Sequence, residues 1–235
     1  MPRSFGSVWR NFNLHWKTYK LLSPFDDTFQ WLAWSTRYFE WIDAHRDEST
    51  VLFSDRSELH RFCVTSRGLE DKAIDYLEFG VAGGESLTWW TSLNTHPDSR
   101  FYGFDTFSGI PEAWGKFPAG SFSTDSALPN IADQRIEYQI GMFQDTLVPF
   151  LEGFRRNRPI VIHLDADLYS STLYVMANLG PRLQAGDLIL LDEAGAVIGI
   201  THEFRALMDY TSAFGQEYRL IGGAFAYVQL ALEVI

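Results

Sequence analysis

Cysteine is nearly absent from this chain. Cys63 is the only cysteine among 235 residues, so neither an intrachain disulfide nor a cluster of cysteine metal ligands can form. A single thiol is typical of proteins that work in a reducing compartment. Residues 1–20 also lack the apolar stretch and small-residue cleavage site of a secretory signal. We therefore expect a cytoplasmic protein.

Long hydrophobic runs and an excess of positive charge are also lacking. Charged residues interrupt the apolar stretches well before the ~20 residues that cross a bilayer, so we expect no association with a membrane. Lysine and arginine number 19 against 30 acidic residues, a formal net charge of −11. Because nucleic-acid binding depends on neutralising phosphates with a basic stripe, we expect no nucleic-acid partner. An acidic cleft would instead suit a cation, whereas most surface carboxylates simply aid solubility.

Two common motifs, one of a catalytic nucleophile and one of a dinucleotide site, are missing as well. No Gly-x-Ser-x-Gly sequence occurs, so hydrolase chemistry on a nucleophile elbow has no support. A glycine-rich turn at residues 76–86 places glycines at 80, 83 and 84, which misses the Gly-x-Gly-x-x-Gly spacing of dinucleotide sites. Glu78 and Glu85 flank this turn, so a pyrophosphate there would meet two negative charges. A cationic cofactor without phosphate fits the turn better.

What the chain does contain is an alternation of short apolar runs with helical patterns, from about residue 74 onward. This alternation predicts βαβ units and a parallel sheet covered by helices on both faces. We expect strands at residues 76–81, 100–105, 136–141, 160–165 and 187–192, and a closing pair at 218–221 and 226–232 joined by Gly222 and Gly223. We expect helices at residues 86–94, 145–156, 171–183 and 201–214. The predicted fold class is α/β, a doubly wound, mostly parallel, seven-stranded Rossmann-like sheet.

The segment before the sheet has a different pattern. Over residues 28–45, large side chains recur at three- and four-residue intervals, namely Trp31, Trp34, Tyr38, Trp41 and Ile42. This spacing predicts a helix with one aromatic face. We interpret residues 1–70 as a helical appendage or cap, and residues 71–235 as the main part of what is a single domain overall. We favour an aromatic face that caps the core, with a homodimer contact as the alternative.

Acidic residues end several of the predicted strands. Asp105 follows the glycine turn by the ~20 residues at which nucleotide-binding folds place an acid on ribose hydroxyls. Asp165 ends the fourth strand, and Asp192 with Glu193 ends the fifth. Parallel strands deliver their carboxyl ends to one edge of the sheet, where ligands bind. We therefore expect a cluster of carboxylates, which needs a cation and offers the hard oxygen ligands that suit Mg²⁺.

Three further features lie near these acids. The segment at residues 108–130 has no periodicity, and a loop of that length is usually functional, so we interpret it as a lid on the substrate side. Asp167 is interpreted as the cap of the next helix. His163 shares a strand face with Asp165 and is considered as a second catalytic residue, although a packed core histidine is the simpler interpretation.

Five segments in chain order resemble the macrocin O-methyltransferase family, which belongs to the class I S-adenosylmethionine-dependent methyltransferases. They are residues 77–86, 101–111, 141–147, 163–172 and 186–193. The resemblance spans roughly residues 74–205 and implies a methyltransferase sheet with S-adenosylmethionine as cofactor and a divalent metal. The chain departs from the family at Glu193, where a second aspartate usually follows the first. Glu193 is therefore either a longer metal ligand or a carboxylate that faces solvent.

The resemblance also implies a role for individual residues. The methionine portion of the cofactor would be held by Glu78, Gly80 and Ser86, with Gly83 in the same turn. The ribose would be held by Asp105, and the adenine region by Thr106 and Gln144. The metal ligands would be Asp165, Asp192 and Glu193, with Asp165 also the preferred general base.

The expected function is transfer of a methyl group from S-adenosylmethionine to a hydroxyl of a sugar-bearing or polyhydroxylated small molecule, assisted by Mg²⁺, in natural product biosynthesis. The aromatic residues Phe107, Trp114, Phe117 and Phe122 leave a phenolic or catechol-type acceptor as an alternative. The departure at Glu193 leaves a cofactor-binding scaffold without turnover as a third hypothesis.

Overall fold

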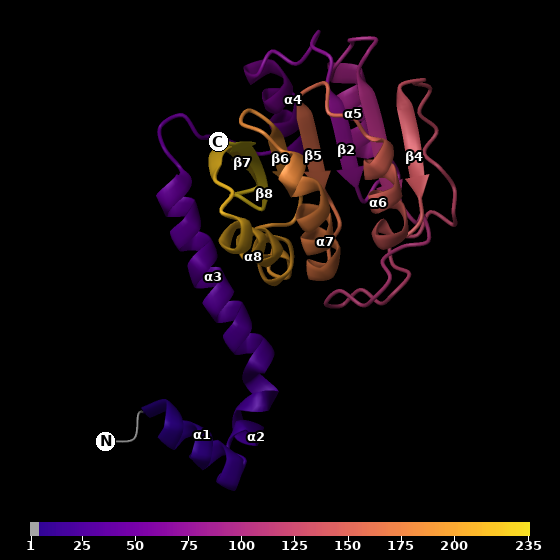
Figure 1. Cartoon of the computed structure of the whole chain (residues 1–235). Helices are drawn as coiled ribbons and strands as arrows, with labels where there is room; N and C mark the ends of the chain where they lie inside the picture. The colour runs from indigo at the N-terminus through magenta and orange to yellow at the C-terminus, as the bar shows by residue number, and fades with distance from the viewer. Residues whose placement is uncertain (1–4) are drawn as a thin grey trace.

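The computed structural model describes residues 5–235 (Figure 1). Eight strands form one sheet in the order β1-β7-β8-β6-β5-β2-β3-β4. Their bounds are β1 Val51–Phe53, β2 Asp75–Phe79, β3 Arg100–Asp105, β4 Ile136–Ile140, β5 Ile160–Leu164, β6 Leu188–Leu191, β7 Tyr218–Ala224 and β8 Gln229–Val234. Only the pairings of β8 with β6 and with β7 are antiparallel. The predicted doubly wound, mostly parallel α/β fold is confirmed.

Three of the described helices precede the first strand, and the others follow β1, β2, β4, β5 and β6 along the chain. Their bounds are α1 Phe5–Trp16, α2 Tyr19–Leu22, α3 Asp26–His45, α4 Arg56–Ser66, α5 Glu85–Leu93, α6 Phe143–Gly153, α7 Tyr169–Leu179 and α8 Glu203–Phe214. Short 3₁₀ turns η1 Ser23–Phe25, η2 Gly180–Arg182 and η3 Gly199–Thr201 complete the set. Pro181 lies in η2, after α7 has ended, because proline cannot supply the amide that a longer helix would need.

The sheet separates two hydrophobic clusters, as the alternation of side chains along a strand requires. In β5, Ile160, Ile162 and Leu164 pack with residues of α3, α6, α7 and α8 on one face. Val161 packs with residues of α4 and α5 on the other face. All five residues of β2 and of β5 are buried, including the polar residues Asp75, Glu78 and His163, so these strands form the centre of the molecule.

Two details of the sheet differ from the sequence prediction. The sheet has eight strands rather than seven, because β1 pairs in parallel with β7 at the edge, Val51 opposite Gly222. A strand of three residues is too short to leave a periodic pattern. Gly222 and Gly223 also lie inside β7 rather than in the closing turn. Glycine is needed at 223 because a Cβ there would lie 2.6 Å from the ring of Tyr227. The turn itself occupies residues 225–228.

The N-terminal helices form an arm on this body. Toward its C-terminal end, α3 packs Tyr38 against Phe204 of α8, with ring centroids 4.8 Å apart, whereas α1 and α2 lie away from the sheet (Figure 1). The predicted appendage of residues 1–70 also includes β1 and α4, yet both are part of the sheet body. The arm therefore ends near His45. No helix among the described residues is long and apolar enough to cross a bilayer.

Candidate active site

The glycine turn after β2 is shaped by contact with the neighbouring strand. Gly80 has φ +94°, and a Cβ there would lie 1.8 Å from the carbonyl oxygen of Asp165, just past the end of β5. Only glycine permits this approach. Gly83, three residues later, has no heavy atom within 4 Å of such a Cβ. The turn thus brings the end of β2 against the backbone that carries Asp165.

Asp105 ties this turn to the start of the lid. Its carboxylate accepts hydrogen bonds from the backbone amides of Val81 and Ala82, both at 2.8 Å, and of Phe107 at 2.7 Å. An ionised carboxylate offers about four acceptor positions, so roughly one remains for a bound molecule. Asp105 also lines the main cavity.

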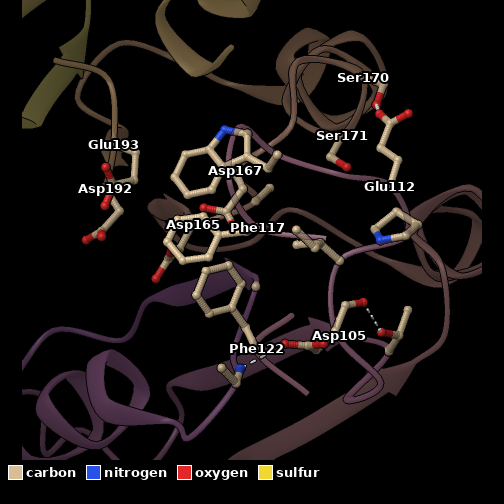
Figure 2. A pocket seen from close by; sticks show the side chains of 18 of the residues that line it. Asp105, Glu112, Phe117, Phe122, Asp165, Asp167, Ser170, Ser171, Asp192 and Glu193 are labelled. Atoms are coloured by element: carbon tan, nitrogen blue, oxygen red, sulfur yellow. Dashed lines mark hydrogen bonds between the residues drawn. The ribbon is translucent and has the colours of Figure 1, made fainter. Parts of the chain in front are cut away.

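Carboxylates converge at the same edge of the sheet. Phe79, Leu164 and Leu191 lie opposite one another at the ends of β2, β5 and β6, and Asp165 and Asp192 follow the last two. Figure 2 shows Asp165 beside Asp167, with Asp192 and Glu193 adjacent and Asp105 across the pocket. One ligand atom each of Asp165, Asp192 and His163 lie within 4.8 Å of one another.

Burial and mutual repulsion shift the protonation of these acids. Burial, with the charge of Asp192, raises the pKa of Asp165 well above its usual range. The same two causes raise the pKa of Asp167 to about 7, and burial, Asp192 and Asp167 raise the pKa of Glu193 to about 7. Because mutual repulsion among these carboxylates favours a bound cation, and carboxylate oxygens suit a hard divalent ion, the cavity edge could hold such an ion. The ligand atoms that lie within 4.8 Å of one another include a nitrogen of His163, however, and none of Glu193.

His163 lies beneath this cluster. Its side chain is fully buried, with Nε2 3.8 Å from Asp192 and Nδ1 3.9 Å from Glu78, and neither nitrogen has a hydrogen-bond partner. Although burial lowers the pKa of His163, Asp192, Glu78 and Asp165 raise it to about 10. The pKa of Asp192 is lowered: His163 and Arg56 outweigh its burial. His163 therefore influences the site indirectly, by lowering the pKa of Asp192.

The cavity above the strand ends has a volume of about 1020 Å³. Most of the predicted site residues line it, namely Gly80, Asp105, Thr106, Gln144, Asp165, Asp192 and Glu193. Four do not: Glu78, Gly83, Ser86 and His163. Glu78 is buried and accepts a hydrogen bond of 2.7 Å from the hydroxyl of Tyr76, and Ser86 is buried in α5. These four border the turn or the floor rather than the open space.

The lid covers one side of this cavity with aromatic rings. Trp114 and Phe117 exchange backbone hydrogen bonds of 2.8 and 2.9 Å and stack with ring centroids 5.6 Å apart. Both line the cavity together with Phe122. Phe107 is fully buried instead and packs edge-on against Tyr138. The segment interpreted as a lid therefore contributes an aromatic wall of three rings to the cavity, and Phe107, just before it, does not take part.

The structure does not support the interpretation of Asp167 as a helix cap. The N-cap of α7 is Leu168, with no side-chain capping bond, so the predicted capping role of Asp167 is wrong. Its backbone has φ +57°, uncommon for a residue other than glycine, and such conformations concentrate at functional sites. Asp167 lines the cavity next to Asp165.

Arg56 is the cavity residue that sequence reasoning missed. Its Nη1 donates to both carboxylate oxygens of Asp192 at 3.2 Å, its Nη2 pairs with Glu85, and its guanidinium lies 5.3 Å from the ring centre of Trp89. It begins α4, far in sequence from every predicted motif. Because it is one of 19 lysines and arginines in the chain, no local pattern distinguished it.

Comparisons with known proteins agree with this geometry. Residues 127–216 match the macrocin-O-methyltransferase (TylF) family. A curated relative from Streptomyces olivaceus, 8-demethyl-8-(2,3-dimethoxy-alpha-L-rhamnosyl)-tetracenomycin-C 4'-O-methyltransferase, is 29% identical over 183 residues, which cover 66% of this chain and 67% of the relative.

Solved structures share the fold. The calicheamicin methyltransferase CalS11 superposes with a TM-score of 0.59 at 22% identity, covering 74% of this chain and 77% of its own. The O-methyltransferase NovP superposes with a TM-score of 0.56 at 20% identity, covering 76% and 78%. At these identities the likeness concerns the fold.

Fold, site and matches together define an enzyme of the S-adenosylmethionine-dependent O-methyltransferase class. Within that class, the resemblance to the macrocin O-methyltransferase family is confirmed. The family match includes three of the five segments that carried the resemblance, residues 141–147, 163–172 and 186–193, and extends through β5, β6 and the helices that follow them.

Proposed function

We propose that this enzyme transfers a methyl group from S-adenosylmethionine to a hydroxyl on the sugar of a glycosylated small molecule, with help from a divalent metal. The observation that carries the proposal is the convergence of Asp105, Asp165, Asp192 and Glu193 on one cavity of about 1020 Å³. The sugar acceptor is supported by the curated relative, which is named for methylating a rhamnosyl tetracenomycin.

On the cofactor side, the cavity wall at Gly80, Asp105, Thr106 and Gln144 would contact S-adenosylmethionine. When bound, this cofactor supplies an electrophilic methyl group on a sulfonium. The acidic wall suits that positive charge, as it would not suit a phosphate. Glu78 and Ser86 are buried and would act from behind the turn, by holding its shape, whereas Gly83, which has open space around it, would contact the methionine portion.

On the acceptor side, Asp165, Asp192 and Glu193 would hold Mg²⁺. A bound divalent cation lowers the pKa of a hydroxyl that it touches. Asp165 is our proposed general base: burial and Asp192 raise its pKa, which makes its carboxylate a better proton acceptor near neutral pH. His163 would serve catalysis as a positioning residue beneath Asp192. The lid rings Trp114 and Phe117 would exclude water above the reacting groups.

Methyl transfer to a rhamnosyl tetracenomycin, the kind of acceptor for which the curated relative is named, tests this function directly. We expect methylated product and S-adenosylhomocysteine by mass spectrometry, with the rate falling when EDTA removes divalent metal. Asp165→Asn should lower kcat by about 10²–10⁴-fold and leave cofactor affinity within a few fold. Asp43→Asn, an exposed change on α3, is the matched control and should behave like the parent. Full turnover by Asp165→Asn would remove Asp165 from the reaction.

The stacked pair of Trp114 and Phe117 also favours a second acceptor class, phenols and catechols, because flat rings stack on aromatic walls. A panel that includes catechols with the glycosylated acceptor separates the two. A higher kcat/KM for the catechols would replace the sugar proposal. Cofactor binding without turnover on the whole panel would favour the scaffold hypothesis.

We also propose that the enzyme works in the cytoplasm on natural product intermediates. The buried, unpaired Cys63 suits a reducing interior, and the curated relative acts on a tetracenomycin.

A further inference from the structure

The cavity presents a charge problem for the cofactor. Besides its sulfonium and ammonium, S-adenosylmethionine carries a carboxylate at its methionine end. Six acidic side chains line the cavity, namely Asp105, Glu112, Asp165, Asp167, Asp192 and Glu193. A carboxylate that enters such a space is repelled unless a cation receives it.

Two cations line the cavity within the part of the chain that the structure describes, Arg56 and Lys116. Lys116 belongs to the lid and lies over the ring of Phe117, 5.2 Å from its centre. Arg56 lies beside the glycine turn instead, since it pairs with Glu85, the first residue of α5. That turn is where the methionine portion is expected.

We propose that Arg56 receives the carboxylate of the cofactor's methionine portion. This inference deepens the proposed function and rests on it. A guanidinium has five N–H donors in a rigid fork that matches a carboxylate, and Arg56 is only partly engaged: its contacts to Asp192 are at 3.2 Å and its partner Glu85 is exposed.

The surroundings of Arg56 hold it ready for this role. The side chain of Asp192 is only 6% exposed, so it is a fixed partner of Arg56. The side chain of Glu85 is 61% exposed and can turn toward water. The bound carboxylate would replace Glu85 on the guanidinium, while Asp192 and the Trp89 ring keep Arg56 in place. In the protein without cofactor, Glu85 therefore occupies the guanidinium group that the cofactor carboxylate would bind.

Binding of two ligands to the full chain tests the assignment. Isothermal titration would compare S-adenosylmethionine with decarboxylated S-adenosylmethionine, which lacks only the carboxylate. The parent protein should bind the complete cofactor about 10- to 100-fold more tightly. Arg56→Gln should bind both compounds with similar, weak affinity. Arg46→Gln changes an exposed arginine that pairs with Asp43 at the end of α3 and does not line the cavity, and this variant should discriminate like the parent.

A second variant keeps the test decisive if Arg56→Gln folds poorly. Glu85→Gln removes the competing carboxylate and should tighten binding of S-adenosylmethionine by up to about fivefold, with no gain for the decarboxylated compound. Retained discrimination in Arg56→Gln, or an equal gain for both ligands in Glu85→Gln, would overturn the inference. A parent protein that binds neither compound would instead overturn the proposed function itself.

Discussion

At the scale of single residues, Asp105 combines structure with binding. Its carboxylate accepts three backbone hydrogen bonds that connect the glycine turn to the lid, so its removal affects both stability and the cofactor. Asp167 and Arg56 also line the cavity, although Asp167 was expected to cap a helix and Arg56 was not singled out from the sequence.

We expect Asp105→Ala to lower the free energy of unfolding by about 1–3 kcal/mol, because buried backbone amides lose their acceptor. It should also weaken binding of S-adenosylmethionine. Urea denaturation and titration calorimetry measure the two effects separately. Asp105→Asn, which keeps one acceptor oxygen, should fall between the parent and the alanine variant. Unchanged cofactor affinity in Asp105→Ala would exclude Asp105 from the ribose site.

Cys63 should be chemically inert in the folded protein. Burial raises the pKa of its thiol to about 12, so almost no thiolate exists at pH 8, and the side chain is fully buried. We expect no reaction with Ellman's reagent at pH 8 until urea unfolds the chain, and one thiol per chain thereafter. Rapid labelling of the native protein would show that α4 opens readily.

At the scale of elements, the turn between β2 and α5 decides where Asp165 lies. A methyl group on Gly80 would collide with the backbone after β5, whereas one on Gly83 meets open space. The two glycines are three residues apart and differ only in their surroundings, so they form a natural pair for comparison.

We expect Gly80→Ala to cost about 1–3 kcal/mol of stability through backbone strain alone and to weaken cofactor binding as it displaces Asp165. Gly83→Ala should fold like the parent. Thermal unfolding and cofactor titration distinguish the two variants. A well-folded Gly83→Ala with weakened cofactor binding would support the predicted contact of Gly83 with the cofactor. Equal stability of both variants would contradict the packing role of Gly80.

At the scale of the whole molecule, the N-terminal arm packs on the body toward the end of α3 but exposes large apolar side chains over the rest of its described length. Leu14 and Trp16 are 73% and 67% exposed, and Phe25, Phe29 and Leu32 continue this apolar surface. Residues 5–25 contain arginine and lysine but no acid, whereas the chain has a net charge of −11. We therefore propose that the arm docks on the acidic body of a second copy, because exposed apolar patches mark interfaces and opposite charges steer them.

Sedimentation at micromolar concentration tests this homodimer. The parent should sediment as a dimer, and the double variant Leu14→Glu with Trp16→Glu as a monomer, because charges on the arm would then be buried against apolar and acidic surface. Val148→Glu, a change at an exposed site on α6, should leave the dimer intact. A monomeric parent would contradict the proposal.

Local patterns were sufficient to predict much of this protein. β3 ends at Asp105 as predicted, and β5 and β6 end one residue before Asp165 and Asp192, the predicted last residues of those strands. Local patterns locate strand ends this closely because the burial of a strand and its end are recorded in consecutive residues. The parallel connections then require those ends to meet at one edge. The aromatic helix before the sheet was predicted for the same reason, since its spacing is a property of one segment.

The sequence by itself thus determined the sheet, its acidic edge and the resemblance to a methyltransferase family. Only the tertiary structure decided that β1 extends the sheet, that Asp167 faces the cavity and that Arg56 neutralises Asp192. Each of these depends on contact between segments far apart in the chain. Such contacts arise from packing in three dimensions, which leaves no periodic or local trace in the order of residues.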